Sequence, residues 1–188
     1  MLASLVKVSR DFDNPMHTKC IEVLANMTRF AVNNKHLSRD ASLVETLLKC
    51  GKSKEVEDRV WALRTFQNIT AEGSSKILLA NSRILTLLSI CAMRKDADEQ
   101  SAAVAALYNL STEPGAVVPL TNTRNVVATL VHLAHDTRTT VQIRGMACDA
   151  LATIGLWLQT LAGSGTVPAS VPKMLLPTHK TSGWDRWD

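Results

Sequence analysis

A short block recurs four times along the chain, and each copy places a polar residue between apolar ones. The four polar residues are Asn26, Asn68, Asn109 and Thr153, which follow one another after 42, 41 and 44 positions. A nearly fixed period of this size is typical of proteins built from stacked helical units. Stacked units share a core and present a long surface, so the repeat predicts an extended binding surface and not a catalytic pocket.

The block has the periodicity of an α-helix. Positions six, five and two before the polar residue, and one after it, are apolar or small in all four copies, and these offsets trace one helix face. A second apolar segment precedes each of the last three blocks, at 43–48, 84–88 and 126–131, and a shorter helix precedes the last two of these. Aromatic residues make up only 4% of the chain, which also favours helices over strands. The sequence therefore predicts an all-α fold with three helices per unit.

Local signals predict where these helices begin and end. Asn14 precedes a proline and is expected to cap a helix, and Asp96 with Glu99 has the spacing of a capping box. Asn81 and Asn122 occupy equivalent positions and are expected to close short helices, since Asn tolerates the left-handed conformation. The long helices are expected to start near residues 15, 54, 97 and 139.

A short, a medium and a long helix in about 42 residues, with the long helix reading Ala-Leu-Tyr-Asn-Leu at 106–110, resembles the armadillo repeat. The resemblance covers roughly residues 15–162, as three full repeats preceded by a long helix without convincing first and second helices. It implies a right-handed α–α superhelix of about three and a half repeats. The related HEAT repeat, with two helices per unit, is the alternative, and the recurrent Asn and the short first helix argue against it.

The chain divides into three segments: a lead-in at 1–14, the repeat domain at 15–162 and a tail at 163–188 with glycines and prolines. The tail ends with Trp184 and Trp187, which are expected either to pack on the last repeat or to form a short motif for a partner. The missing opening half-repeat leaves an apolar helix face at the N-terminal edge. Self-association through that edge or through the Trp-rich tail is one hypothesis about partners.

The resemblance also implies a site. In armadillo proteins the long third helices line the concave face, and the recurrent Asn often hydrogen-bonds the backbone of an extended peptide. This role is implied for Asn26, Asn68 and Asn109. A carboxamide can pair with both the C=O and the N–H of a peptide, whatever its side chains. The alternative is that these side chains cap loops or bond adjacent helices, and both roles can coexist.

Residues one turn earlier on the same face are expected to set specificity; they are Glu22, Arg64, Ala105 and Asp149. In nuclear-import adaptors of the importin-α type this position usually carries Trp. Here none does, and Trp61 lies seven residues before Asn68 instead of four, which does not favour recognition of nuclear-localisation signals. Thr153 stands in place of Asn in the last unit, so the peptide grip is expected to end near the third.

Other functional classes find little support. The net charge of +4 arises from 21 basic and 17 acidic residues, which form no dense basic cluster. A helical-repeat nucleic-acid binder is therefore kept only as an alternative hypothesis, and an import-type cargo adaptor is another. No Gly-rich phosphate loop or G-x-S-x-G motif occurs, and no cofactor or enzymatic activity is expected. His132, His135 and Asp136 have ligand-like spacing, but a third helical ligand is missing, so no metal site is expected.

The four cysteines lie far apart without a C-x-x-C motif, and Cys20 and Cys148 fall on apolar positions of the block. Buried, reduced thiols are expected, which favours an intracellular location, cytoplasmic or nuclear. No signal-peptide core or membrane-spanning run is present. The sequence thus predicts a non-enzymatic scaffold or adaptor that binds a protein or an extended peptide. The residues expected to be buried between repeats are Leu63, Phe66, Leu107, Leu110, Leu151 and Ile154.

Overall fold

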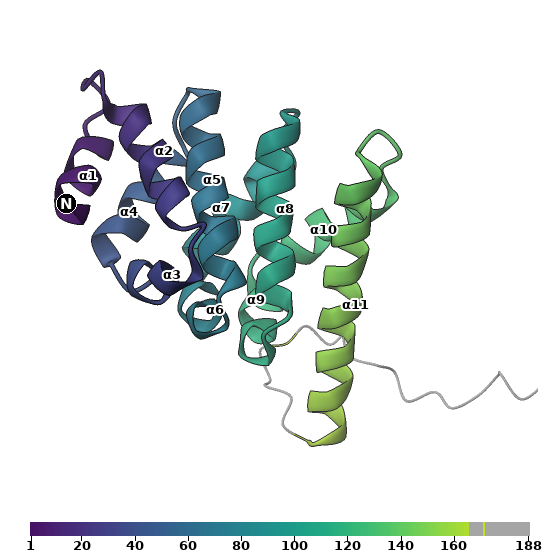
Figure 1. The fold of residues 1–188 in the computed structure, drawn as a ribbon. Coiled ribbons are helices and arrows are strands. Elements are labelled where there is room, and N and C mark those ends of the chain that lie inside the picture. The colour runs from purple at the N-terminus through teal and green to yellow at the C-terminus, as the bar shows by residue number, and fades with distance from the viewer. Residues whose placement is uncertain (166–170, 172–188) are drawn as a thin grey trace, which may run out of the picture.

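The computed structural model describes residues 1–165 and 171, and the regular structure in that part is entirely helical (Figure 1). The first unit comprises α1 (Leu2–Ser9) and α2 (His17–Met27), and the second comprises α3 (Ala31–Leu37), α4 (Ala41–Cys50) and α5 (Val56–Ala71). The third comprises α6 (Gly73–Leu79), α7 (Ser82–Ala92) and α8 (Ala97–Ser111). The fourth comprises a 3₁₀ turn, η1 (Pro114–Ala116), followed by α9 (Val117–Asn122), α10 (Val126–His135) and α11 (Val141–Gly163).

The units stack helix on helix. The long helices α2, α5, α8 and α11 contact one another in that order, and α1, α4, α7 and α10 form a second series in the same way. In Figure 1 the long helices follow one another from left to right, with α7 and α10 behind them. The predicted three-helix unit is confirmed, and the long helices begin within about two residues of the expected positions. Helix α1 occupies the place of a second helix in the first unit, where the sequence predicted none.

Two of the predicted helix caps differ from the observed ones. Asp96 caps α8 as expected, since its Oδ1 accepts hydrogen bonds from the backbone N–H of Asp98 and Glu99 at 3.1 and 2.9 Å. The Glu99 side chain does not complete the capping box, because it pairs with Arg59 of the preceding unit. The Asn14 side chain accepts a hydrogen bond from Met16 N at 2.9 Å, so it orders the turn before α2 and does not cap the helix itself.

The prediction that Asn81 and Asn122 close short helices is confirmed for Asn122 and wrong for Asn81, and neither residue has a left-handed backbone. Asn81 has an extended backbone, with φ −108°, and its side chain accepts a hydrogen bond from Ile84 N, so it starts α7 as an N-cap. Asn122 is the last residue of α9. The left-handed residue of this segment is Asn125, with φ 71°, directly before α10.

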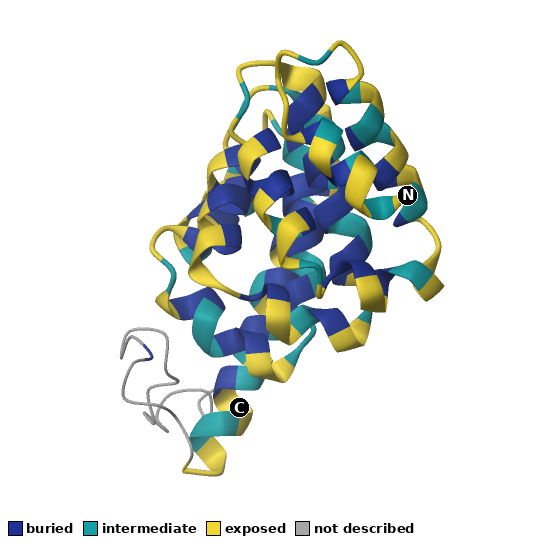
Figure 2. Cartoon of the chain, turned by 90° about the vertical axis from the view of Figure 1, so that its left-hand side faces the viewer, coloured by how far each residue is buried: buried dark blue, intermediate teal, exposed yellow. Residues whose placement is uncertain are grey.

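The hydrophobic core runs between the two helix series, and buried positions face inward on every unit (Figure 2). Five of the six predicted core residues are buried, and the exception is Leu151, which is only partly buried. Leu151 belongs to α11, the last helix of the described solenoid, so one of its faces has no following unit to pack against.

No single helix in the described part is long and apolar enough to cross a membrane. Helices α6 and α7 together have the length and apolar composition of a membrane span, but the pair is bent by 95°.

Buried polar contacts connect equivalent positions of successive units. Asp58 at the start of α5 accepts hydrogen bonds from the hydroxyls of Thr18 and Ser53, each at 2.8 Å, and lies 3.2 Å from His17 Nε2. One unit later Glu99 takes the place of Asp58 and pairs with Arg59. Buried charges are costly unless they are paired, so these contacts restrict how one unit can stack on the next.

The cysteines depart in part from expectation. Cys50 and Cys91 are buried thiols, Cys20 is partly buried, and Cys148 is exposed on α11. The prediction that Cys148 is buried was wrong, because Cys148, like Leu151, lies on α11, which has no following unit in the described residues. Glycine next to Cys50 leaves room for Leu87 of α7, because a Cβ on Gly51 would lie 2.6 Å from a methyl carbon of Leu87 and the end of that side chain would have to shift.

Candidate binding face

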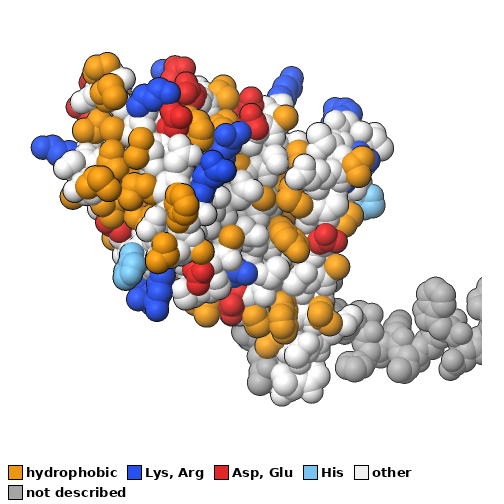
Figure 3. Space-filling model, viewed as in Figure 1, with side chains coloured by type: hydrophobic (Ala, Val, Ile, Leu, Met, Phe, Trp, Pro, Cys, Tyr) orange, Lys and Arg blue, Asp and Glu red, His pale blue; other side chains and the backbone are white. Residues whose placement is uncertain are grey.

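The exposed sides of α2, α5, α8 and α11 form one continuous surface, called here the third-helix face, which Figure 3 shows from the front. Hydrophobic side chains gather over its α1–α2 end, and Lys or Arg side chains lie near its centre. All six predicted site residues belong to these helices. Asn26 and Asp149 are exposed, whereas the remaining four are partly buried: Glu22, Arg64, Asn68 and Asn109.

Two of the recurrent Asn residues bond the preceding unit. Asn68 Nδ2 donates to Ala25 O at 3.2 Å and to Thr28 Oγ1 at 3.1 Å. Asn109 Nδ2 repeats the arrangement one unit later, since it donates to Gln67 O at 3.0 Å and Thr70 Oγ1 at 3.4 Å. The interhelical role that the sequence left open is therefore present.

The acceptor half of these carboxamides is unused within the described residues. Neither Asn68 Oδ1 nor Asn109 Oδ1 accepts a hydrogen bond there, and neither atom is among the buried unsatisfied ones. A carboxamide oxygen has two lone pairs, so each can accept a backbone N–H of a bound chain. Thr153, the equivalent residue of α11, bonds only its own helix, with its hydroxyl donating to Asp149 O at 2.7 Å.

The structure brings three predicted site residues together in a hollow of about 330 Å³ between α2 and α5. This α2–α5 hollow is lined by Ala25, Asn26, Arg29, Trp61, Arg64, Gln67 and Asn68. Glu22, Asn109 and Asp149 are not part of its lining. Glu22 instead pairs with Lys19 on its own helix at 2.7 Å.

Trp61 was not predicted as a site residue, because it lies seven residues before Asn68 and not at the position, four residues before the recurrent Asn, that was expected to set specificity. Trp61, Arg64 and Asn68 are spaced i, i+3 and i+7, which places them on one face of α5. The Arg64 guanidinium lies over the Trp61 ring, 5.1 Å from its centroid. Arg29 was also missed, since it lies just beyond the C-cap of α2 and outside the recurring block.

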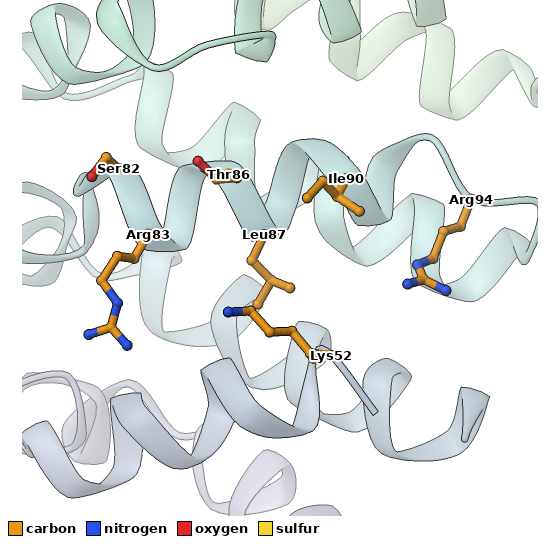
Figure 4. Close-up of a pocket in the computed structure, with 8 residues that line it drawn as sticks. Lys52, Ser82, Arg83, Thr86, Leu87, Ile90 and Arg94 are labelled. Atoms are coloured by element: carbon orange, nitrogen blue, oxygen red, sulfur yellow. The ribbon is translucent and has the colours of Figure 1, made fainter. Parts of the chain in front are cut away.

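A larger hollow of about 520 Å³ lies between α4 and α7, on the other helix series. Figure 4 shows Leu87 and Lys52 close together, with Arg83 and Arg94 toward the two ends. Arg83 makes a bidentate ion pair with Glu45 and holds the pKa of that carboxyl below its usual value. Arg94 Nε lies 3.5 Å from Glu99 Oε2, so two of the three cations here are already paired.

The histidine pair of the sequence analysis does not form a ligand set. His132 and His135 are exposed, and His132 Nε2 lies 3.7 Å from Asp136 Oδ2. Asp136 is bonded mainly by Arg138, which lowers the pKa of the carboxyl to about 2. Nowhere in residues 1–165 or at residue 171 do three His, Cys, Asp or Glu side chains gather as metal ligands.

No family model matches the chain, and no curated protein matches it in sequence. Solved structures match it in fold. A computationally designed armadillo repeat protein for modular peptide recognition superposes with a TM-score of 0.74 at 19% identity, over 88% of this chain and 71% of that one. A designed armadillo repeat protein in complex with the peptide (KR)4 gives 0.70 at 19% identity, over 93% and 77%.

An engineered protein gives a TM-score of 0.73 at 23% identity, over 88% of this chain and 68% of the other. At sequence identities this low, the matches show a shared fold and nothing about function. Together with the three-helix unit and the stacked long helices, these matches show that the chain has an armadillo-like repeat fold, an all-α solenoid.

Proposed function

We propose that this chain is a non-enzymatic interaction scaffold that binds an extended segment of a partner protein along the third-helix face. The observation that carries the proposal is the state of Asn68 and Asn109. Their amide nitrogens are held by the preceding unit, while their oxygens have no partner among the described residues. Both acceptors are thus fixed in place at the same position of successive units, as backbone recognition of a peptide requires.

The spacing of the units fits an extended chain. Packed helices lie roughly 8–10 Å apart, and an extended chain advances about 3.3 Å per residue. Successive Asn residues therefore meet every second or third residue of a bound segment, which presents its N–H groups on one side at alternate positions. The designed armadillo neighbours, one described with a bound peptide and one as built for peptide recognition, support the same use of this fold.

The remaining features of the proposal follow from the same evidence. The unpaired thiols support an intracellular location, cytoplasmic or nuclear. The armadillo-like fold supports a scaffold over an enzyme. Recognition of basic import signals gains no support, because the α2–α5 hollow is itself lined by two arginines. Trp184 and Trp187, proposed as part of a partner motif, lie outside the described residues, and self-association stays a prediction.

The test separates the two roles of the Asn residues. Peptides selected from a random display library would be measured by fluorescence anisotropy against an Asn68→Ala/Asn109→Ala variant and a Thr28→Val/Thr70→Val variant. The Thr variant breaks hydrogen bonds from the same amides but keeps both Asn oxygens. We expect only the Asn variant to lose affinity, by roughly two- to twelvefold per lost bond.

Thermal melts of both variants provide the control for folding. Equal loss of affinity in the two variants would mean that the Asn residues act only between helices. Unchanged affinity in the Asn variant would refute the proposed contact outright.

A further inference from the structure

The α2–α5 hollow has an unbalanced charge. Its lining contains the guanidinium groups of Arg29 and Arg64 and no carboxylate. Arg29 forms no ion pair or side-chain hydrogen bond with any described residue. We propose that this hollow binds the carboxylate of an Asp or Glu side chain of the extended segment, which makes the third-helix face selective for acidic sequences. This inference rests on the proposed function and names the chemistry of its ligand.

Arg64 is prepared for a carboxylate. Its guanidinium lies over the Trp61 ring, 5.1 Å from the centroid, and this cation–π contact holds the group at the hollow. One Nη atom donates to Asp98 at 3.1 Å, and the other donors have no acceptor among the described residues. A planar fork with free donors suits bidentate binding of a carboxylate.

The pair with Asp98 does not block this use of Arg64. The Asp98 side chain is 68% exposed and that of Arg64 is 41% exposed, and ion pairs in such surroundings contribute little because water screens them. A ligand carboxylate in the hollow would lie beside the apolar Trp61 ring, where less water competes. The two interactions can also coexist, since they use different donors of one guanidinium.

Neighbouring amides add donors without adding negative charge. Asn26 and Gln67 line the hollow, and neither side chain has a hydrogen bond to a described residue. A carboxylate accepts up to about four hydrogen bonds, so two guanidinium groups and two carboxamides match its capacity. The α4–α7 hollow differs, because Arg83 and Arg94 there already face Glu45 and Glu99.

The experiment compares three fluorescein-labelled octapeptides, (Glu-Ser)4, (Gln-Ser)4 and (Lys-Ser)4, by anisotropy at constant ionic strength. We expect the acidic peptide to bind most tightly and the basic one most weakly. Arg29→Gln and Arg64→Gln should each weaken binding of the acidic peptide by at least about tenfold, the lower end of what a charged hydrogen bond contributes, and leave binding of (Gln-Ser)4 nearly unchanged. Arg39→Gln removes the same charge at an exposed position outside the hollow and should change little.

Three results would overturn the inference: no preference for the acidic peptide, no measurable binding of it, or equal losses from Arg39→Gln and Arg29→Gln. The last would mean that only the overall charge attracts acidic peptides. The proposed function is judged separately, by the effect of Asn68→Ala/Asn109→Ala on (Gln-Ser)4 and on peptides from the display library. Circular dichroism melts would verify that each Arg variant remains folded.

Discussion

Replacing Glu99 by Leu while Arg59 stays in place should be strongly destabilising. The two side chains connect α5 with α8 and are 1% and 6% exposed. Arg59 Nε donates to Glu99 Oε1 at 3.0 Å, and its Nη1 donates to Ser53 O and Lys54 O at 2.9 and 2.6 Å. An arginine guanidinium stays protonated in proteins at any pH at which they fold, so in the Glu99→Leu variant Arg59 cannot escape the loss of its partner by deprotonation.

The magnitude follows from burial. Removing one partner of a buried ion pair costs about 3–5 kcal/mol, because the other charge is left in a poor environment. Replacing both by apolar residues of similar size, Arg59→Met with Glu99→Leu, is expected to cost far less than the sum of the single changes. The double variant should still lose at least about 1 kcal/mol of unfolding free energy, because the carbonyls of Ser53 and Lys54 lose Arg59 Nη1 as their hydrogen-bond donor.

A double-mutant cycle from urea denaturation, followed by circular dichroism and by tryptophan fluorescence, measures the coupling. Agreement of the two probes establishes that unfolding is cooperative across the repeats. The control cycle uses Arg83 and Glu45, which also connect successive units but are 61% and 47% exposed, and its coupling should stay below about 1 kcal/mol. A loss under about 1 kcal/mol for Glu99→Leu, or additive losses in the buried cycle, would refute the reasoning.

Four further predictions concern the core and the cysteines. Leu107→Ala should lower the free energy of unfolding by about 2–5 kcal/mol, since it removes a fully buried side chain; a variant as stable as the wild type would contradict the packing. Gly51→Ala should cost about 0.5–1.5 kcal/mol in the same assay, because the end of the Leu87 side chain would have to turn away from the added methyl group. Iodoacetamide should label Cys148 in the folded protein, and Cys50 only after unfolding, as mass spectrometry of peptides would reveal. Burial raises the pKa of Cys50 from 9.0 to about 12, so its contribution to stability is complete below pH 9 and should be lost as the pH rises from 9 to 12.

The repeat could be predicted from sequence because its evidence is local and occurs four times. Each long helix presents apolar residues at the same offsets, and helical periodicity then fixes which face is buried. Where one residue type serves two purposes, the pattern was not sufficient. Asn81 and Asn125 both stand beside helix starts, yet only Asn125 is left-handed, because Asn suits an N-cap and a positive φ alike.

Contacts between units could not be predicted in this way. Glu99 has the spacing of a capping box, but a buried arginine 40 positions earlier competes for its carboxylate and prevails. The α2–α5 hollow was only partly foreseen for a similar reason. Asn26, Arg64 and Asn68 followed from the repeat, whereas Arg29 enters the hollow from the turn after α2, which no periodic pattern describes.

The bonds from Asn68 and Asn109 run in one direction, since each donates to the unit before it. Each unit therefore fixes the orientation of the Asn side chain on the next unit toward α11. Asn26 has no such bond among the described residues and must give up rotamer freedom when it engages a ligand, at a cost of about 0.5–1.5 kcal/mol. A bound segment should consequently be held more firmly over α5 and α8 than over α2, and truncations from the two ends should have unequal effects. Loss of the first unit would release Asn68, whereas loss of the last would leave Asn109 in place.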